Sequence, residues 1–362
     1  MNDLAHLQTP AFLVDRNIVE QNCTRMREKA RASGVSFRPH VKTHKTIEIG
    51  RMQHGDAIGP ITVSTLAEAE FFAGAGFKDI TYAFPIAPEK LDRAHAIAKR
   101  IDALNLLIDS EVALQAIEKS GVRTPVFLKV DCGYHRAGVD PDSDGSVRLA
   151  KAIAQSKFAR LKGLLTHAGH SYDAHNAGEV REVAVEERSC VTRFREHLGM
   201  ADLVRSVGST PTMSVVDRFQ DVDEVRPGNY VFFDAFQAAV GSCKREDVAV
   251  SVLATVVGSY PERGQAIIDA GALALSKDLG PTHLDPKISY GIVCDLEMRS
   301  LPMRLVSVSQ EHGKIEAKNP PPVGTLVRVV PNHSCLTAAM FDVYHVLDRG
   351  KLVDEWRPCR GW

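Results

Sequence analysis

The segment with the most concentrated chemistry is the run VSFRPHVKTH, residues 35–44. In an extended strand, alternate side chains point to the same side. One side of this strand would be apolar, and the other would carry four nitrogen-bearing residues: Arg38, His40, Lys42 and His44. Directing such side chains inward costs free energy unless they meet anions or a polar ligand. The run therefore predicts a binding site, with a solvated edge strand as the alternative.

A pair with metal-binding chemistry lies near the C-terminus, in the run PNHSC, residues 331–335. Residues two apart in an extended chain point the same way, so His333 and Cys335 can share one metal ion. Imidazole with thiolate favours zinc over magnesium or manganese. The alternative is a buried cysteine beside an unrelated histidine, because two ligands are a weaker signal than a complete zinc motif.

Further polar groups follow the expected strands, at the end where barrels place their sites. These segments are residues 131–138, 167–172, 208–212 and 226–230. The turn Gly208-Ser209-Thr210 offers backbone N–H groups, two hydroxyls and the start of a helix, which suits a phosphate. Barrels often hold phosphate after strands seven and eight, which is where this turn is expected.

The elements that must position these residues alternate between strand and helix from residue 16 to about residue 240. We expect eight strands, near 35–42, 59–65, 79–84, 103–109, 124–131, 160–167, 203–209 and 223–227. Helical stretches between them include 66–76, 88–100, 141–157 and 174–198. Eight strands joined by crossovers favour an α/β fold of the (β/α)8 TIM-barrel type, with a doubly wound open sheet as the alternative.

After about residue 245 the sequence changes to β-type runs with little helix between them. We therefore expect two domains. Residues 14–242 would form the barrel, and residues 243–362, together with 1–13, would form a mostly β domain that carries the His333–Cys335 motif.

The bulk composition limits the possible partners and the cellular setting. The net charge is −1 and no long run of one sign occurs, so nucleic acid is not an expected partner. No stretch approaches the ~18 apolar residues of a membrane span, and the first residues lack the pattern of a secretory signal. The seven cysteines are scattered and odd in number, which is typical of a reducing, cytoplasmic setting.

Taken together, these motifs resemble the alanine-racemase-fold (fold type III) enzymes that use pyridoxal 5'-phosphate (PLP), and among them the zinc-dependent D-serine dehydratases. The resemblance covers nearly the whole chain. It begins at residues 9–15, and its most specific parts are residues 38–45 and 331–335.

The resemblance implies a role for each candidate residue. Lys42, not Lys45, would form the Schiff base with PLP, and Tyr172 would face the substrate as a second catalytic residue. His333 and Cys335 would bind Zn2+ or another divalent metal. The other expected cofactor contacts are His40, Arg136, His167, Gly208, Ser209, Thr210 and Tyr230. Members of this fold usually form homodimers.

The implied reaction is elimination of the β-hydroxyl from a D-serine-like substrate, which yields a 2-keto acid and ammonia. A metal-dependent D-threonine or 3-hydroxy-D-aspartate aldolase is the closest alternative, because both reactions would begin with the same aldimine and the same metal-bound hydroxyl. Arg38, His40 and His44 would be compatible with an extra carboxylate, so 3-hydroxy-D-aspartate stays open as a substrate. D-threonine aldolases tend to carry His-x-Asp at the metal motif and Gly-Gly-Gly-Thr at the phosphate turn, whereas this chain has Cys335 and Gly208-Ser209-Thr210. A racemase would leave the metal pair without a role, and a non-catalytic PLP-binding protein would not need the β domain.

Overall fold

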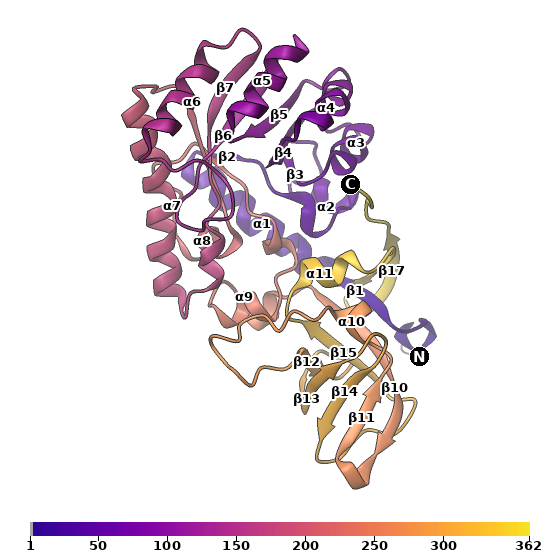
Figure 1. Cartoon of the computed structure of the whole chain (residues 1–362). Coiled ribbons are helices and arrows are strands. Elements are labelled where there is room, and N and C mark those ends of the chain that lie inside the picture. Colours follow the sequence, from indigo (N-terminus) through magenta and orange to yellow (C-terminus); the bar gives the residue numbers. More distant parts are fainter. Residues whose placement is uncertain (1–2) are drawn as a thin grey trace. The chain divides into compact units, whose positions relative to one another are not determined.

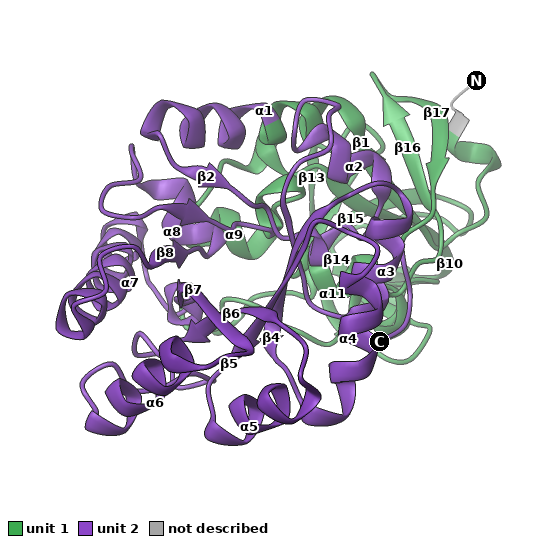
Figure 2. Cartoon of the chain, turned by 90° about the horizontal axis from the view of Figure 1, so that it is seen from above, with its two compact units in different colours: residues 1–23, 229–358 green, residues 24–228, 359–362 purple. Residues whose placement is uncertain are grey.

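The computed structural model describes residues 3–362, which form two compact units. The barrel unit comprises Thr24–Gly228 and Cys359–Trp362, and the β unit comprises the chain up to Cys23 and Asn229–Pro358 (Figure 2). The helix α1 (Arg16–Ser33) runs from the β unit into the barrel unit.

The barrel unit contains a sheet of eight parallel strands in the order β2-β9-β8-β7-β6-β5-β4-β3. The strands are β2 (Ser36–Phe37), β3 (Ile61–Val63), β4 (Asp79–Pro85), β5 (Ala103–Ile108), β6 (Thr124–Lys129), β7 (Ala159–Leu165), β8 (Val204–Val207) and β9 (Glu224–Val225). A parallel bridge between His40 and Thr62 joins the two ends of the sheet, and the Thr62 N–H donates to the Pro39 carbonyl at 2.9 Å. The sheet therefore closes into a barrel.

Helices follow the strands and lie around the sheet (Figures 1 and 2). They are α2 (Ile47–Met52), α3 (Leu66–Gly74), α4 (Leu91–Ala98), α5 (Glu111–Ser120), α6 (Asp144–Gln155), α7 (Ala177–Leu198) and α8 (Thr210–Val215). Helices on the outside and side chains on the inside bury both faces of the strands, which is why β5 and β6 are nearly continuous apolar runs.

The first barrel strand is much shorter than expected. β2 ends at Phe37, and Lys42 lies instead in a single 3-10 turn, η2 (Val41–Thr43). Pro39 has no N–H to continue the ladder, and the His40 ring accepts a hydrogen bond from the Lys42 N–H at 3.3 Å, which starts the turn. The expected alternation of inward side chains therefore stops before Lys42 and His44.

The β unit contains a nine-stranded sheet in the order β11-β14-β13-β12-β15-β10-β1-β16-β17. An additional pairing of β10 with β11 closes six of these strands into a ring. The strands are β1 (Ala11–Asp15), β10 (Val250–Tyr260), β11 (Gln265–Ile268), β12 (Gly291–Cys294), β13 (Ser300–Val308), β14 (Gly313–Ala317), β15 (Leu326–Pro331), β16 (Tyr344–Asp348) and β17 (Lys351–Trp356). Three short helices, α9 (Ala235–Ala239), α10 (Ala272–Leu275) and α11 (Ser334–Ala339), belong to the same unit.

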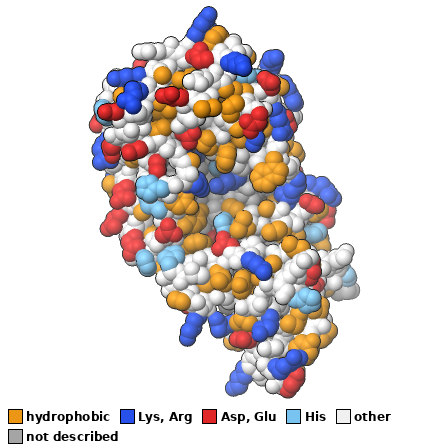
Figure 3. Space-filling model, viewed as in Figure 1, with side chains coloured by type: hydrophobic (Ala, Val, Ile, Leu, Met, Phe, Trp, Pro, Cys, Tyr) orange, Lys and Arg blue, Asp and Glu red, His pale blue; other side chains and the backbone are white. Residues whose placement is uncertain are grey.

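The predicted fold class, an α/β barrel with a second, mostly β domain, is confirmed. None of the helices in residues 3–362 is long and apolar enough to span a membrane. On the face seen in Figure 3, acidic and basic side chains are interspersed, as the net charge of −1 leads one to expect.

Candidate active site

Lys42 lies on a tightly held segment at the end of the first barrel strand. It is half-buried in the turn η2, between the buried residues Val41 and Thr43. The His40 N–H donates to the Pro227 carbonyl at 2.9 Å. Gly228 allows this approach, since a Cβ there would lie 3.0 Å from the His40 carbonyl oxygen. The segment that carries Lys42 is thus held between β2, which precedes it, and the residues that follow β9.

Two neutral histidines accompany Lys42. Burial, and then the nearby Lys42 charge, lowers the pKa of His40 and of His167 well below the ordinary value. His167 follows β7 and its Nδ1 lies 2.6 Å from the Gly208 carbonyl oxygen, so it donates from this nitrogen. A neutral imidazole beside the lysine can contact an aromatic ring without adding a positive charge.

The turn expected to bind phosphate has a conformation that requires glycine. Gly208 has φ +148°, and a Cβ at this position would lie 2.7 Å from the Arg226 backbone nitrogen. Ser209 follows as the N-cap of α8 and forms a capping box with Thr212. The backbone of this turn is therefore pressed against the strand that precedes Arg226.

Replacing Gly208 by Ala is expected to destabilise the protein by roughly 1–3 kcal/mol, because the new Cβ is strained in φ and meets backbone. Thermal unfolding checks this, and the loss should be accompanied by weaker PLP binding. Gly74→Ala is the matched control, since nothing lies within 4 Å of its Cβ position in α3. Equal melting temperatures for Gly208→Ala and the wild type would contradict the strained geometry.

Arg136 and Tyr172 lie on loops that follow barrel strands. Arg136 is exposed, and its guanidinium lies 5.1 Å from the centre of the Tyr134 ring. Arg136, Lys129 and His167 line one small pocket in the barrel unit. Tyr172 is half-buried at the end of the 3-10 turn η4 (Gly169–Tyr172), directly after β7. Tyr230 belongs to the β unit, where it is fully buried in the turn η5 (Asn229–Val231).

Two further cations of the barrel unit lie near strand ends: Arg226, which belongs to the segment 226–230 indicated by the sequence but had no role assigned, and Lys129, which was not singled out. Burial lowers the pKa of Arg226 to about 10, and its Nε donates to the Ser206 hydroxyl at 2.7 Å. Burial also lowers the pKa of Lys129, at the end of β6, to about 8. The positive charge of Arg226 adds to this lowering of the Lys129 pKa. The signal for both was their place at strand ends, the same signal that selected the expected residues.

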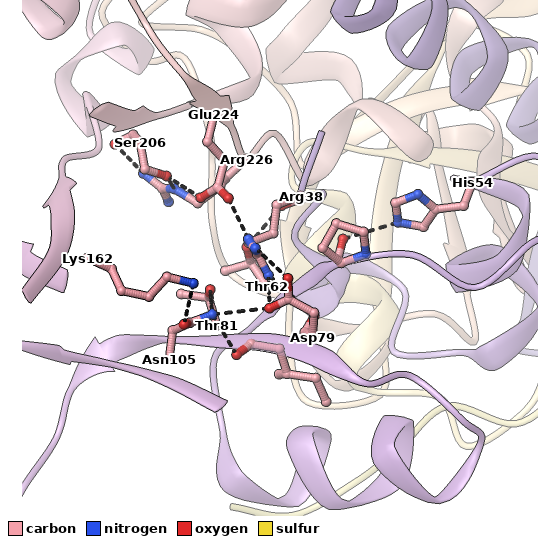
Figure 4. A network of polar contacts seen from close by, with 12 residues as sticks. Arg38, His54, Thr62, Asp79, Thr81, Asn105, Lys162, Ser206, Glu224 and Arg226 are labelled. Carbon is pink, nitrogen blue, oxygen red and sulfur yellow. Dashed lines mark hydrogen bonds and ion pairs between the residues drawn. The ribbon is translucent and has the colours of Figure 1, made fainter. Parts of the chain in front are cut away.

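Two of the four nitrogen-bearing residues of the run 35–44, both of them buried, are engaged by other groups of the protein. Arg38 forms ion pairs with Asp79 at 2.8 Å and Glu224 at 2.6 Å, which raise its pKa against the effect of burial (Figure 4). Burial lowers the pKa of His44 to about 3, and its ring accepts from the Thr46 N–H at 3.1 Å. Neither side chain is therefore available to bind an extra substrate carboxylate.

In the β unit, His333 and Cys335 lie together, but not on an extended chain. The Asp234 carboxylate accepts from the Ser334 N–H at 3.0 Å, which favours the start of α11, and Cys335 falls in its first turn. Asn229 Nδ2 lies 3.6 Å from the Cys335 sulfur. Burial opposes charge on His333, but Asp278 and Cys335 raise its pKa to about 11.

Asp278 was missed in the sequence, since it lies far from His333 along the chain. Its Oδ2 is 2.8 Å from His333 Nδ1, which leaves Nε2 for a metal. A carboxylate that orients an imidazole in this way is common behind metal-binding histidines. In residues 3–362 no group of three or more His, Cys, Asp or Glu side chains is arranged around one metal position. His333 and Cys335 therefore remain the two predicted metal ligands of this group.

Asp278→Asn is expected to weaken metal binding about 10- to 100-fold, because the amide orients the His333 ring less strongly. Titration of chelator-treated protein with zinc measures the change. Asp285→Asn, an exposed carboxylate in the same connection between α10 and β12, is the control. Unchanged affinity in Asp278→Asn would mean that the carboxylate does not support a metal ligand.

Known protein families match segments of both the barrel unit and the β unit. The chain matches the family described as "Alanine racemase, N-terminal domain" over residues 14–235 and the family described as "Putative serine dehydratase domain" over residues 249–347. It therefore belongs to the alanine-racemase-fold family, and it is a PLP-dependent lyase of the serine dehydratase branch.

Two relatives match along their whole length. D-serine dehydratase of Dictyostelium discoideum is 39% identical, with 100% of this chain and 99% of that protein covered. The structure of D-threo-3-hydroxyaspartate dehydratase from Delftia sp. HT23 is 39% identical, covers 100% of both chains and superposes with a TM-score of 0.93. A structure of a cysteine variant of that enzyme is described as the metal-free form.

Proposed function

We propose that this enzyme removes the β-hydroxyl of a D-β-hydroxy amino acid, with release of a 2-keto acid and ammonia, and that it needs both PLP and a divalent metal. The observation that carries the proposal is the presence in one chain of a lysine on a barrel-end turn and a His–Cys group backed by a carboxylate. The 39% identity to two dehydratases supports elimination as the reaction.

PLP fits the barrel unit by charge and by shape. Lys42 would bind the cofactor aldehyde, the neutral His40 and His167 would flank it, and Arg136 would face it. The turn Gly208-Ser209-Thr210 would hold the phosphate. When bound, PLP withdraws electrons from the Cα of the joined amino acid.

Lys42 also has the chemistry to move the α-proton. A lysine released from the cofactor is a free amine close to Cα, and an amine is a suitable general base when it is neutral. Tyr172, on the turn after β7, would face the substrate from the same end of the barrel.

A divalent metal would supply the chemistry needed at the β-carbon. Hydroxide is a poor leaving group at neutral pH, and a bound metal supplies a Lewis acid worth several kcal/mol. His333 and Cys335 would hold it, and the imidazole–thiolate pair favours zinc. Asp278 would keep His333 in the metal-binding orientation.

We propose D-serine or D-threo-3-hydroxyaspartate as substrate, the two named for the 39% identical relatives. Because Arg38 and His44 are not available to a ligand, the expected inward cations do not favour the substrate with the second carboxylate. We also propose, from the resemblance, a homodimer, which light scattering of the purified protein would test, and, from the seven scattered cysteines, a cytoplasmic setting.

Product analysis tests the proposal directly. Purified enzyme with PLP and zinc should convert D-serine or D-threo-3-hydroxyaspartate to ammonia and a keto acid, and a chelator should stop the reaction. Glycine and an aldehyde from D-threonine or 3-hydroxy-D-aspartate would identify an aldolase instead. Elimination that continues in metal-free enzyme would contradict the role of the metal.

A further inference from the structure

The buried carboxylate of Glu187 has no part in the reaction described above. α7 packs one stripe of residues against the barrel, with Val180, Ala184, Phe194 and Leu198 among its buried positions. Glu187 lies on the same stripe and its exposed fraction is 0%. Burying a carboxylate is strongly unfavourable unless hydrogen bonds satisfy its oxygens. Its position among apolar residues therefore requires specific partners.

Glu187 finds these partners in the two loops that flank the phosphate turn. Its Oε1 accepts from the Ala168 N–H at 3.0 Å and from the Gly208 N–H at 3.1 Å. Its Oε2 accepts from the Thr212 hydroxyl at 2.9 Å. One side chain thus joins the segment after β7 to the turn after β8.

The contacts around Glu187 fix the orientation of the turn. The Gly208 N–H is directed to Glu187, while the Gly208 carbonyl accepts from His167 at 2.6 Å. The backbone N–H and the carbonyl of Gly208, which belong to the two peptide units on either side of its Cα, are therefore both held by residues from α7 and the segment after β7. The Ser171 and Ser209 hydroxyls, 2.9 Å apart, form a further link between the same two loops.

The negative charge of Glu187 is balanced by its surroundings. A carboxylate close to a phosphate would repel the dianion in a medium of low dielectric constant. Arg226 and Lys129 lie close enough for Glu187 to raise the pKa of both cations, in opposition to burial. Glu187 can therefore orient the turn without leaving an excess of negative charge beside it.

We propose that Glu187 is a positioning residue: through its hydrogen bonds to Gly208, Ala168 and Thr212, it shapes the turn so that the protein binds PLP in preference to unphosphorylated pyridoxal. The inference rests on the proposed function, since it takes PLP as the cofactor. Glu187 acts through the turn and would not itself contact the phosphate.

The test compares the dissociation constants of PLP and pyridoxal for the apoenzyme, followed by absorbance. In Glu187→Ala two backbone N–H groups lose their acceptor. The dissociation constant of PLP should therefore rise about 10- to 100-fold. The pyridoxal constant should change less than about threefold, because pyridoxal has no phosphate to lose contacts. A general structural defect would weaken the binding of PLP and of pyridoxal by the same factor, and that outcome would overturn the inference.

Two milder variants keep the test valid if Glu187→Ala folds poorly. Glu187→Gln retains a carbonyl oxygen for the two N–H donors, so its preference for PLP should stay within about threefold of the wild type. Thr212→Val removes one of the three donors and should reduce the preference about three- to tenfold. Glu182→Gln, an exposed position on the same helix, is the matched control. The hydrogen-bonding role would be contradicted if Glu187→Gln lost as much of the preference for PLP as Glu187→Ala. It would also be contradicted if Thr212→Val kept the preference of the wild type.

The wild type separates this inference from the proposed function. If wild-type apoenzyme binds neither compound covalently, the proposed function fails and the inference with it. If the wild type prefers PLP and Glu187→Ala keeps the same preference, only the inference fails.

Discussion

Lys42→Ala is expected to abolish the covalent link to PLP and to reduce the rate of elimination by more than about 10⁴-fold, because one amine both holds the cofactor and moves the α-proton. The visible absorbance of the lysine–cofactor adduct should disappear on the same substitution. Absorbance spectra of PLP-loaded protein and a coupled keto-acid assay measure the two effects. PLP should remain weakly bound through the phosphate turn.

Lys45→Ala is the control for Lys42→Ala. Lys45 lies three residues further along the chain, and its Nζ forms an ion pair with the buried Glu68 at 3.0 Å. That pairing directs the amine to a carboxylate, so the variant should keep the absorbance of the adduct. A loss of absorbance in Lys45→Ala, with normal absorbance in Lys42→Ala, would reverse the assignment.

Cys335→Ser is expected to lower zinc content and to reduce elimination about 10³-fold, because the hydroxyl is a much poorer zinc ligand than the thiolate and the Lewis acid is worth several kcal/mol. PLP absorbance should be unchanged, since the metal group and the lysine lie in different units. Metal analysis of the purified protein and the same keto-acid assay provide the measurements.

Cys243→Ser, another partly exposed cysteine of the β unit, is the matched control and should retain metal and activity. Full activity of Cys335→Ser after exhaustive chelation would exclude a catalytic metal at this position. Loss of PLP absorbance in the same variant would indicate a general structural defect instead.

The barrel could be predicted from the sequence because its local patterns agree with the fold. The eight short apolar runs separated by helical stretches all correspond to strands of the closed sheet. Lys42 was selected by assuming that one extended strand runs through residue 42. The strand ends at Phe37 instead, because Pro39 interrupts the ladder and the chain turns before Lys42. The same interruption moves His44 off the expected alternation, whereas Arg38 lies before it and meets the carboxylates of Asp79 and Glu224.

The residues that the sequence did not reveal act across long separations. Asp278 reaches His333 from the connection between α10 and β12, and no local spacing indicates that contact. Glu187 had a weak signal, since a glutamate in the apolar stripe of a helix must have buried partners. Those partners, Ala168, Gly208 and Thr212, become neighbours only when the barrel closes.

The most direct test of the account is to reduce the PLP-loaded enzyme with borohydride and to locate the pyridoxyl group by peptide mass mapping. The account predicts one modified peptide, with the pyridoxyl group on Lys42. Lys129 is the main competitor, because burial lowers its pKa to about 8 and it lines the same small pocket as His167. A pyridoxyl group on Lys129 or Lys45, or no modified lysine at all, would contradict the central claim.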